Sequence, residues 1–515
     1  MCGLLGFVLL LLAPQAHGYS YLMVLHTASK SHHTVGAALA KGLLAAGHGV
    51  TLISAFPQTK PLDKLIHVNT PNTIDAMAKH KTRILDNAQL SVVQRYPRIH
   101  RMGLDLAEAL LAASTVQELL KEQRSYDAVI VEAFMNDAHY GFAEHFGGAP
   151  LIALSTLGAT GWTSDLVGTP SPPSYVPHSL LQFSDRMDFG QRAQNLGFHI
   201  FEYFYQRWFH LPRQEALYRQ YFPNNTQDFH EMRRSTSLVL LNNHVSISAA
   251  RPYAPNMIEV GGMHIDRTNR QPLPQDIEEF IQASQHGVIY FSLGSSLNSK
   301  DLPRGKRRAI VETLRGLKQR VLWKFEDEHL PDKPANVFIS SWFPQADILA
   351  HDKVIAFITH GGLLSTTESI YHGKPVLGIP FFGDQFMNMA NAESAGFGLT
   401  LAYHQLTANR FRAAIERITS DSSYTEQALA MSSRFRDQLV APLERAVFWV
   451  EHVTRHKGAR YLRSACQDLS LVEYHNLDVL GTLFAGLGVV MGLCFVLLRF
   501  LVVKVWDGRR KDKMH

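Results

Sequence analysis

The stretch from Trp342 to Gln385 carries the most information about the fold, and it reads WFPQADILAHDKVIAFITHGGLLSTTESIYHGKPVLGIPFFGDQ. Its apolar run Val354–Thr359 has the length and the β-branched content of a buried strand. Gly361 and Gly362 then open a helix pattern, and a second short apolar run follows at Pro375–Ile379. This order of strand, helix and strand is typical of a parallel α/β sheet.

The same alternation of strands and helices extends outward in both directions from this stretch. In the second half it predicts strands at Val288–Leu293, Val321–Phe325 and Val337–Ser340 and a helix at Arg307–Lys318. In the first half it predicts strands at Tyr21–Leu25, Val50–Ile53, Tyr126–Val131 and Leu151–Leu154 and a helix at Thr34–Ala46. The Pro-rich segment Gln271–Pro274 separates the halves. We therefore predict two doubly wound, Rossmann-like α/β domains, residues 19–270 and 271–475, that face each other across a ligand cleft.

Length and composition support two folded domains and exclude some classes of protein. The chain has 515 residues, of which 46% are hydrophobic, so it can bury two large cores. A net charge of +5 is small for this length, and the basic residues are scattered along the chain. The sequence therefore predicts no nucleic-acid surface.

Both ends of the chain have the pattern of targeting segments. Residues 1–18 contain the apolar run Leu4–Leu12 and a small-residue cleavage pattern, as in a secretory signal peptide. Residues 479–503 are long and apolar enough for a single transmembrane helix. The basic tail, residues 504–515, is then cytosolic, and the main body is lumenal. Lysines three and five positions from the end, Lys513 and Lys511, resemble the dilysine retrieval signal of endoplasmic-reticulum membrane proteins.

Two further features concern the lumenal body. Cys2 lies in the predicted signal peptide and Cys494 in the predicted span, which leaves Cys466 without a partner for an intrachain disulfide. The triplet Asn224-Asn225-Thr226 is a sequon for N-glycosylation at Asn224.

The loop between the strand Val354–Thr359 and the next helix has the chemistry of an anion site. In parallel sheets the loops at the carboxyl ends of strands bind ligands. The glycines of His360-Gly361-Gly362 allow a close approach, and the free N–H groups of the helix start suit a diphosphate. Glu368 comes about two turns later, where it can accept hydrogen bonds from ribose hydroxyls.

Several motifs in this stretch together resemble the signature of the UDP-glycosyltransferase family, in its membrane-anchored animal form. They are Trp342-Phe343-Pro344-Gln345, His360-Gly361-Gly362, Ser365, Glu368, Gly378-Ile379-Pro380 and Asp384-Gln385. The resemblance extends over essentially the whole chain and implies the two-domain GT-B fold and transfer of a sugar from a UDP-sugar.

The resemblance also implies roles for single residues in the donor site. Trp342 would stack on uracil, Gln345 and Glu368 would bind ribose, and Asp384 and Gln385 would hold the sugar hydroxyls. His360 and Ser365 would contact the diphosphate, and Gly362 and Ser295 are the other residues assigned to the donor site.

The general base of the family is a histidine in the loop after the first strand, and the resemblance favours His32 over His33 for this role. His32 would take the proton of an acceptor hydroxyl in a single displacement with inversion. A histidine base usually has a carboxylate that orients it. Many relatives carry aspartate after the strand that ends at Val131, whereas this chain has Glu132. We expect Glu132 to orient His32, with Asp137 as the alternative.

The sequence predicts neither a metal site nor a cofactor. It contains no Asp-x-Asp element of the kind that metal-dependent sugar transferases use, and a helix N-terminus with His360 can neutralise the diphosphate. The UDP-sugar is then a co-substrate. The other expected partners are a small lipophilic acceptor and the membrane, while both a monomer and a homo-oligomer stay open.

The acceptor side of the sequence is less specific. The aromatic segment Phe198–Phe209 fits an acceptor pocket, a membrane contact or a core helix. The segment Gly168–Pro177 resembles a loop of invertebrate family members, which favours glucose over glucuronic acid as the transferred sugar.

Two other classes of function would fit part of the sequence. A binding protein that has lost catalysis would account for the unusual Glu132, although the presence of His32 argues against it. A membrane-tethered adhesion or receptor domain would have little use for the motifs between Trp342 and Gln385.

Overall fold

The computed structural model of the chain describes residues 18–57, 61–81, 90–265, 271–295 and 297–511. The predicted signal peptide, except Gly18, and the last lysine of the tail, Lys513, lie outside these ranges. The described chain divides into two compact units, residues 1–463 and 464–515.

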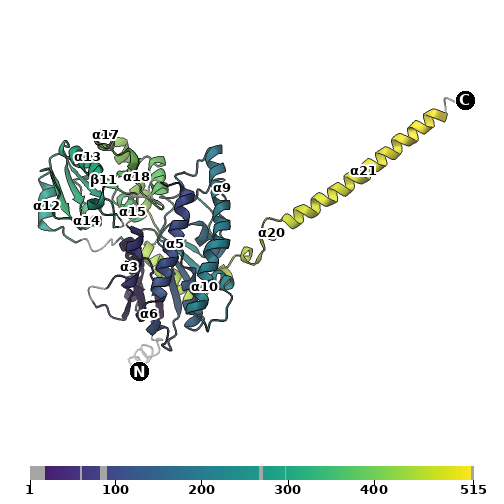
Figure 1. Cartoon of the computed structure of the whole chain (residues 1–515), viewed down its shortest axis with the longest axis horizontal. Coiled ribbons are helices and arrows are strands. Elements are labelled where there is room, and N and C mark those ends of the chain that lie inside the picture. Colours follow the sequence, from purple (N-terminus) through teal and green to yellow (C-terminus); the bar gives the residue numbers. More distant parts are fainter. Residues whose placement is uncertain (1–17, 58–60, 82–89, 266–270, 296, 512–515) are drawn as a thin grey trace, which may run out of the picture. The chain divides into compact units, whose positions relative to one another are not determined.

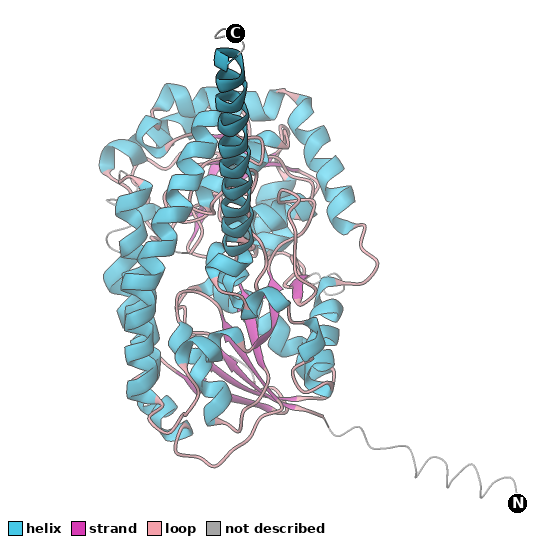
Figure 2. Ribbon diagram, turned by 90° about the vertical axis from the view of Figure 1, so that its right-hand side faces the viewer, coloured by secondary structure: helices cyan, strands magenta, loops and turns pink. Residues whose placement is uncertain are grey.

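The first unit contains two parallel sheets, as the alternation of strands and helices predicts. The first sheet has seven strands in the order β3-β2-β1-β4-β5-β6-β7, and the second has six in the order β10-β9-β8-β11-β12-β13. Every pair of neighbouring strands is parallel. The predicted α/β fold with two Rossmann-like sheets is therefore confirmed, and Figure 2 shows helices around the strands.

The elements of the first sheet and its helices cover residues 20–259. The strands are β1 Ser20–Val24, β2 Gly49–Ser54, β3 Leu65–Asn69, β4 Ala128–Glu132, β5 Leu151–Ser155, β6 Thr236–Leu241 and β7 Met257–Glu259. The helices are α2 Lys30–Ala45, α3 Asn72–Lys81, α5 Val92–Leu111, α6 Ser114–Leu119, α7 Gly141–His145, α8 Gly161–Val167, α9 Phe189–Tyr205, α10 Leu211–Tyr221 and α11 Phe229–Arg234, with a 3₁₀ turn at Asp137–Tyr140 and a π-helical turn at Gln206–His210.

The elements of the second half begin at residue 275. The strands are β8 Val288–Ser292, β9 Arg320–Lys324, β10 Val337–Ser340, β11 Val354–Thr359, β12 Val376–Gly378 and β13 Gly398–Thr400. The helices are α12 Gln275–Gln282, α13 Arg304–Arg315, α14 Gln345–Leu349, α15 Leu363–Tyr371, α16 Gln385–Ser394, α17 Ala408–Ser420, α18 Ser422–Arg436, α19 Pro442–Arg455, α20 Leu471–Tyr474 and α21 Leu477–Lys511, with 3₁₀ turns at Ser299–Asp301, Tyr403–Gln405, Arg460–Leu462 and Ala465–Asp468.

Each sheet separates two apolar cores, because successive side chains of a strand point to opposite faces. Along β1, Leu22 and Val24 belong to one core and Tyr21 and Met23 to the other. Helices α5 and α9 lie side by side at the first sheet (Figure 1), where Tyr96 and Phe198 are in edge-to-face contact at 5.5 Å.

Two features of the fold differ from the sequence-based expectation. Helix α2 begins at Lys30 rather than at Thr34, because the extended backbone of Ser29 ends the loop and its carbonyl accepts from the N–H of His33 at 3.0 Å. His32 therefore lies in the first turn of a helix and not in a loop. Helix α19, which follows the second sheet in sequence, packs on α2 of the first, so that Leu443 lies beside Gly42. The division at residue 271 stays a prediction.

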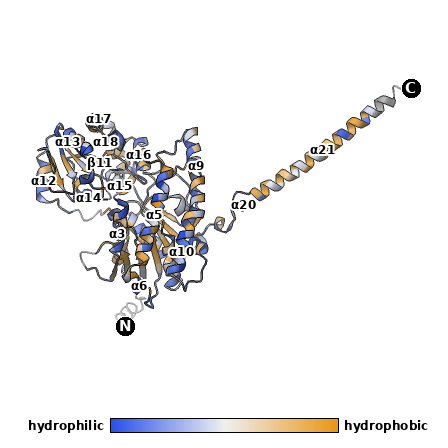
Figure 3. Ribbon diagram, viewed as in Figure 1, coloured by the Kyte–Doolittle hydropathy of each residue, from blue (hydrophilic) through white to orange (hydrophobic). Residues whose placement is uncertain are grey.

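The second unit contains the predicted membrane span. Helix α21 includes Leu477–Trp506, 30 residues that contain an 18-residue window with a mean hydropathy of 2.5, and by length and composition this segment can cross a membrane. Figure 3 shows apolar residues along this helix.

Candidate active site

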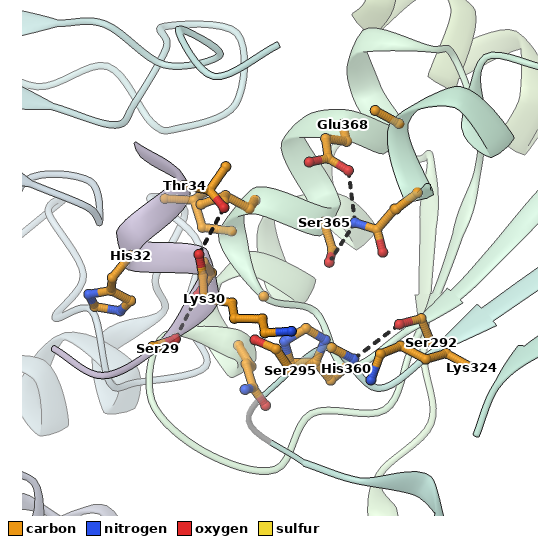
Figure 4. A pocket seen from close by; sticks show the side chains of 18 of the residues that line it. Ser29, Lys30, His32, Thr34, Ser292, Ser295, Lys324, His360, Ser365 and Glu368 are labelled. Atoms are coloured by element: carbon orange, nitrogen blue, oxygen red, sulfur yellow. Dashed lines mark hydrogen bonds between the residues drawn. The ribbon is translucent and has the colours of Figure 1, made fainter. Parts of the chain in front are cut away.

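A cavity of about 340 Å³ is lined by residues from both halves of the chain. On one side are Lys30 and His32 of helix α2, and on the other are His360, Ser365 and Glu368 (Figure 4). All nine residues predicted for the donor site line this cavity, together with His32; the nine are Ser295, Trp342, Gln345, His360, Gly362, Ser365, Glu368, Asp384 and Gln385. Their individual roles stay predictions.

His360 lies at the end of β11, where two glycines make room for its ring. A Cβ atom added to Gly294 would lie 2.5 Å from His360 Cε1, and one added to Gly362 would also collide with the imidazole. Burial, with a smaller contribution from the nearby charge of Lys324, lowers the pKa of His360 to about 4. The imidazole is therefore neutral at neutral pH and can donate one hydrogen bond to a ligand.

The carboxylate of Glu368 is part of a polar cluster suited to a diol. Gln345 Nε2 donates to Glu368 Oε2 at 2.8 Å and lies 3.3 Å from Ser365 Oγ. The other carboxylate oxygen, Oε1, lies 3.3 Å from His264 Nε2. This cluster fits the ribose-binding role that the resemblance implies for Gln345 and Glu368, and the contribution of His264 had no sequence signal.

Asp384 and Gln385 are both held in place by neighbouring groups. Gln385 Oε1 accepts from the backbone N–H groups of Phe381 and Phe382 at 2.8 and 3.2 Å, so its amino group is left to donate. Asn388 Nδ2 donates to Asp384 Oδ2 at 2.8 Å. Burial raises the pKa of Asp384. An amide donor next to a carboxyl group suits the hydroxyls of a sugar.

Trp342 and two lysines complete the lining around the donor site. The indole of Trp342 is 57% exposed, and Lys30 Nζ lies 4.4 Å from its ring centroid. Lys324 Nζ pairs with Glu326 Oε1 at 2.7 Å. Neither Lys30 nor Lys324 is expected at the site from the sequence. Lys324 is the last residue of strand β9, which shows no motif, and only the folded chain brings Lys30 next to Trp342.

His32 has a buried carboxylate next to it. His32 Nδ1 lies 2.5 Å from Glu132 Oε1 and 2.9 Å from Thr156 Oγ1. Burial alone would raise the pKa of Glu132, but His26 and His32 hold this pKa well below its usual range. The carboxylate is therefore ionised, and a proton on Nδ1 leaves Nε2 of His32 free to act as a base.

Asp137, the alternative partner of His32, is engaged elsewhere. Its carboxylate lies 2.6 Å from Arg233 Nε and 3.3 Å from His210 Nε2. Glu132, and not Asp137, contacts His32, while Asp137 is part of a buried ion-pair cluster in the first half of the chain.

The other predicted sites lie away from the cavity. Asn224 is exposed, as glycosylation requires. In the aromatic segment 198–209, Phe198 is buried in a core, whereas Tyr203, Trp208 and Phe209 are about half exposed or more, and none of the segment lines the donor cavity. Within the described ranges, no three His, Cys, Asp or Glu side chains are arranged to hold a metal ion. Metal independence stays a prediction.

Comparisons with known proteins agree with this geometry. The family profile described as UDP-glucoronosyl and UDP-glucosyl transferase matches residues 47–512. UDP-glucosyltransferase 2 of Dactylopius coccus is 34% identical over 492 residues, which cover 94% of this chain and 93% of the relative. UDP-glucuronosyltransferase 2A3 of Mus musculus is 38% identical over 340 residues, 65% of this chain and 60% of the relative.

Solved glycosyltransferase structures share the fold. The glycotransferase of kitacinnamycin aligns with a TM-score of 0.57 at 19% identity and covers 84% of this chain and 99% of its own. Os79 from O. sativa, solved in complex with U2F and trichothecene, aligns with a TM-score of 0.56 at 15% identity and covers 84% of this chain and 100% of its own. The arrangement of the two sheets is thus that of GT-B glycosyltransferases.

Proposed function

The chain belongs to the UDP-glucuronosyl and UDP-glucosyl transferase family, and we propose that it transfers glucose from UDP-glucose to a hydroxyl of a small lipophilic acceptor. As a member of this family it is an enzyme that takes its sugar from a UDP-sugar. One observation carries the proposal: His32 of the first half, with buried Glu132 beside it, lines the same cavity as the donor residues of the second half.

In the proposed reaction His32 Nε2 takes the proton of the acceptor hydroxyl. The acceptor oxygen forms a bond to the anomeric carbon while the bond from that carbon to the β-phosphate oxygen breaks, and UDP leaves with the electron pair. The attack comes from the side opposite the leaving group, so the configuration is inverted. The ionised Glu132 stabilises the imidazolium form of His32 that results.

The leaving diphosphate meets several groups that stabilise negative charge. The first turn of helix α15 offers backbone N–H groups and the positive end of its dipole. Neutral His360 and the hydroxyl of Ser365 can each donate a hydrogen bond. These groups support our proposal that transfer requires neither a metal ion nor a cofactor.

The charges around the cavity support glucose as the transferred sugar. The carboxylate of a glucuronic acid donor would favour an unpaired cation. Both lysines of the cavity lining already have partners, since Lys30 lies over Trp342 and Lys324 pairs with Glu326. The match to the Dactylopius glucosyltransferase also spans 94% of this chain, against 65% for the mouse glucuronosyltransferase.

The acceptor side is apolar close to the base. Leu157 and Phe382 line the cavity together with His32 and Thr156. Apolar side chains beside the base favour a small lipophilic alcohol or phenol over a sugar or a peptide. We propose such an acceptor, as expected of an enzyme of detoxification.

For the location, we propose a single-pass anchor in the endoplasmic-reticulum membrane with the body in the lumen. Helix α21 is long and apolar enough to span a bilayer, and the sequon at Asn224 is exposed, as expected of a lumenal glycoprotein. Protease protection of the body in sealed microsomes, together with a mass shift on glycosidase treatment that is absent in Asn224→Gln, would test this topology.

Activity is tested by incubating microsomes that contain the full chain with labelled UDP-glucose or UDP-glucuronic acid and a panel of phenols. We expect labelled phenyl glucoside from UDP-glucose. A product only from UDP-glucuronic acid would overturn the donor assignment. UDP binding without any product in any combination would instead support a protein that binds the donor without transferring it.

A further inference from the structure

Glu132 has a second histidine beside it, in addition to His32. His26 follows strand β1 and is fully buried, and its Nδ1 lies 3.2 Å from Glu132 Oε2. The other carboxylate oxygen, Oε1, faces His32. Glu132 therefore lies between two imidazoles, of which only that of His32 lines the cavity.

The ring of His26 is held in this orientation by aromatic neighbours. It makes an edge-to-face contact with His139, with ring centroids 5.3 Å apart, and lies 6.3 Å from the ring of Phe134. Neither ring nitrogen of His26 forms a regular hydrogen bond with any described residue, so the approach of Nδ1 to Glu132 Oε2 at 3.2 Å is a close contact of two buried polar groups. The carboxylate of Glu132 is thus the polar group that a buried N–H of His26 can satisfy.

His139 cannot replace His26 in this role, because both of its ring nitrogens are engaged. Its Nε2 lies 3.0 Å from the carbonyl oxygen of Ala107, and its Nδ1 lies 3.0 Å from Asn136 Nδ2. Burial lowers the pKa of His139 to about 3, so this imidazole is neutral. His139 packs against His26, but it neither donates a hydrogen bond to Glu132 nor forms an ion pair with this carboxylate.

The length of the Glu132 side chain explains why it needs an anchor. A glutamate has one more rotatable bond than an aspartate, so its carboxylate has more orientations to lose when it holds His32. The backbone N–H of Thr27 donates to Oε2 at 3.0 Å, on the same oxygen that His26 faces. The Thr27 hydrogen bond and the contact with His26 both lie on Oε2, which leaves Oε1 directed toward His32.

We propose that His26 is a positioning residue for sugar transfer: its Nδ1–H donates to Glu132 Oε2 and so keeps Oε1 on Nδ1 of His32, with His32 Nε2 free to accept the proton of the acceptor. Both the Nδ1–H tautomer and the imidazolium form of His26 carry this proton, so the role requires no change of charge. His26 keeps its proton throughout the reaction. The inference rests on the proposed transfer reaction.

The test compares two substitutions of His26 in the full-length protein. His26→Phe keeps a ring among the aromatic neighbours and removes the donor, whereas His26→Asn keeps an N–H donor. By analogy with partners that orient metal-binding histidines, we expect His26→Phe to lower kcat by about 10- to 100-fold. KM for UDP-glucose and the affinity for UDP should not change, because the donor residues belong to the second half. His26→Asn should restore most of kcat.

A matched control comes from another buried histidine of the first half. His178 lies 3.1 Å from the buried carboxylate of Glu202 and does not line the cavity. His178→Phe therefore makes the same chemical change beside a carboxylate that is remote from the reaction. We expect it to lower the melting temperature and to leave kcat per folded molecule at the wild-type value.

A double substitution shows whether His26 acts through Glu132. If it does, His26→Phe should have little further effect on kcat in a Glu132→Gln background, because the group that it orients is gone. If the double variant instead loses kcat by the product of the two single losses, the proposal is overturned. A wild-type kcat in His26→Phe would also overturn it. An equal loss in His26→Asn, or a parallel loss of UDP affinity, would indicate a purely structural role and would also overturn it. A wild-type enzyme that transfers no sugar would instead refute the proposed function itself.

Discussion

Replacing Glu132 with glutamine should slow sugar transfer by about a thousandfold and leave UDP binding unchanged. The carboxylate is fully buried and faces three donors: His32 Nδ1 on one oxygen, and the Thr27 N–H and His26 on the other. A glutamine has only one acceptor oxygen, so its amino group must face one of these donors. An amino group facing His32 favours the tautomer with the proton on Nε2, which cannot act as a base.

The magnitude follows from what an orienting carboxylate contributes in comparable sites. The corresponding change in a serine-protease triad costs about 10⁴-fold in kcat, and general-base catalysis as a whole contributes about 10²- to 10⁴-fold. Thr156 Oγ1, 2.9 Å from His32 Nδ1, can retain part of the orientation, so we take the middle of this range. A thousandfold loss corresponds to about 4 kcal/mol of transition-state stabilisation.

The assay is single-turnover formation of labelled glucoside at saturating UDP-glucose, with UDP affinity and melting temperature measured on the same samples. Asp137→Asn is the matched control, because it removes the other buried carboxylate that the sequence offers as a partner for His32. A kcat of Glu132→Gln within about threefold of wild type would refute the assignment of the orienting carboxylate. So would an equal loss of kcat in Asp137→Asn at unchanged UDP affinity.

Three further outcomes are expected. Trp342→Ala should weaken UDP binding by about 1–3 kcal/mol in a calorimetric titration if the indole stacks on uracil, and an unchanged affinity would exclude stacking. His360→Ala should lower kcat by about 10²- to 10³-fold through loss of a donor to the leaving diphosphate, with the pH dependence of kcat between pH 6 and 8 unaltered because His360 is already neutral there. Burial opposes the charge of Asp137, but Arg233 and His210 hold its pKa well below the usual value. The ionised carboxylate therefore stabilises the folded state fully above about pH 4, and this contribution is lost as the pH falls toward the folded-state pKa. Asp137→Asn should lower the free energy of unfolding by about 3 kcal/mol at pH 7 and by less at pH 2, as measured in unfolding titrations.

The donor half of the site could be predicted from the sequence because its residues lie close together along the chain. Strand β11, the helix start after Gly362 and the Asp384-Gln385 pair fall within one 44-residue stretch, so a local pattern specifies their positions. The order of strands and helices likewise follows from apolar runs that alternate with amphipathic ones. These features depend on residues that are near one another in the sequence, so one sequence is enough to predict them.

The residues that were missed are brought to the site by the packing of distant segments. Lys30 reaches Trp342 across the cavity, and His26, in the loop after strand β1, lies beside Glu132, which is more than 100 positions away in the sequence. With 26 histidines in the chain, no spacing distinguishes His26 from those that only pack. The return of helix α19 to the first sheet had no sequence signal either, since its apolar face would suit any core.

In the proposed mechanism, His32 of the first half activates an acceptor for attack on a sugar held by the second half. The direct measurement is the anomeric configuration and the rate of formation of phenyl glucoside from UDP-α-glucose by the wild-type enzyme and by His32→Ala. We predict a β-glucoside from the wild type and a loss of at least about 10²-fold in kcat for His32→Ala at unchanged UDP affinity. An α-glucoside, or His32→Ala turnover equal to that of the wild type, would contradict the mechanism.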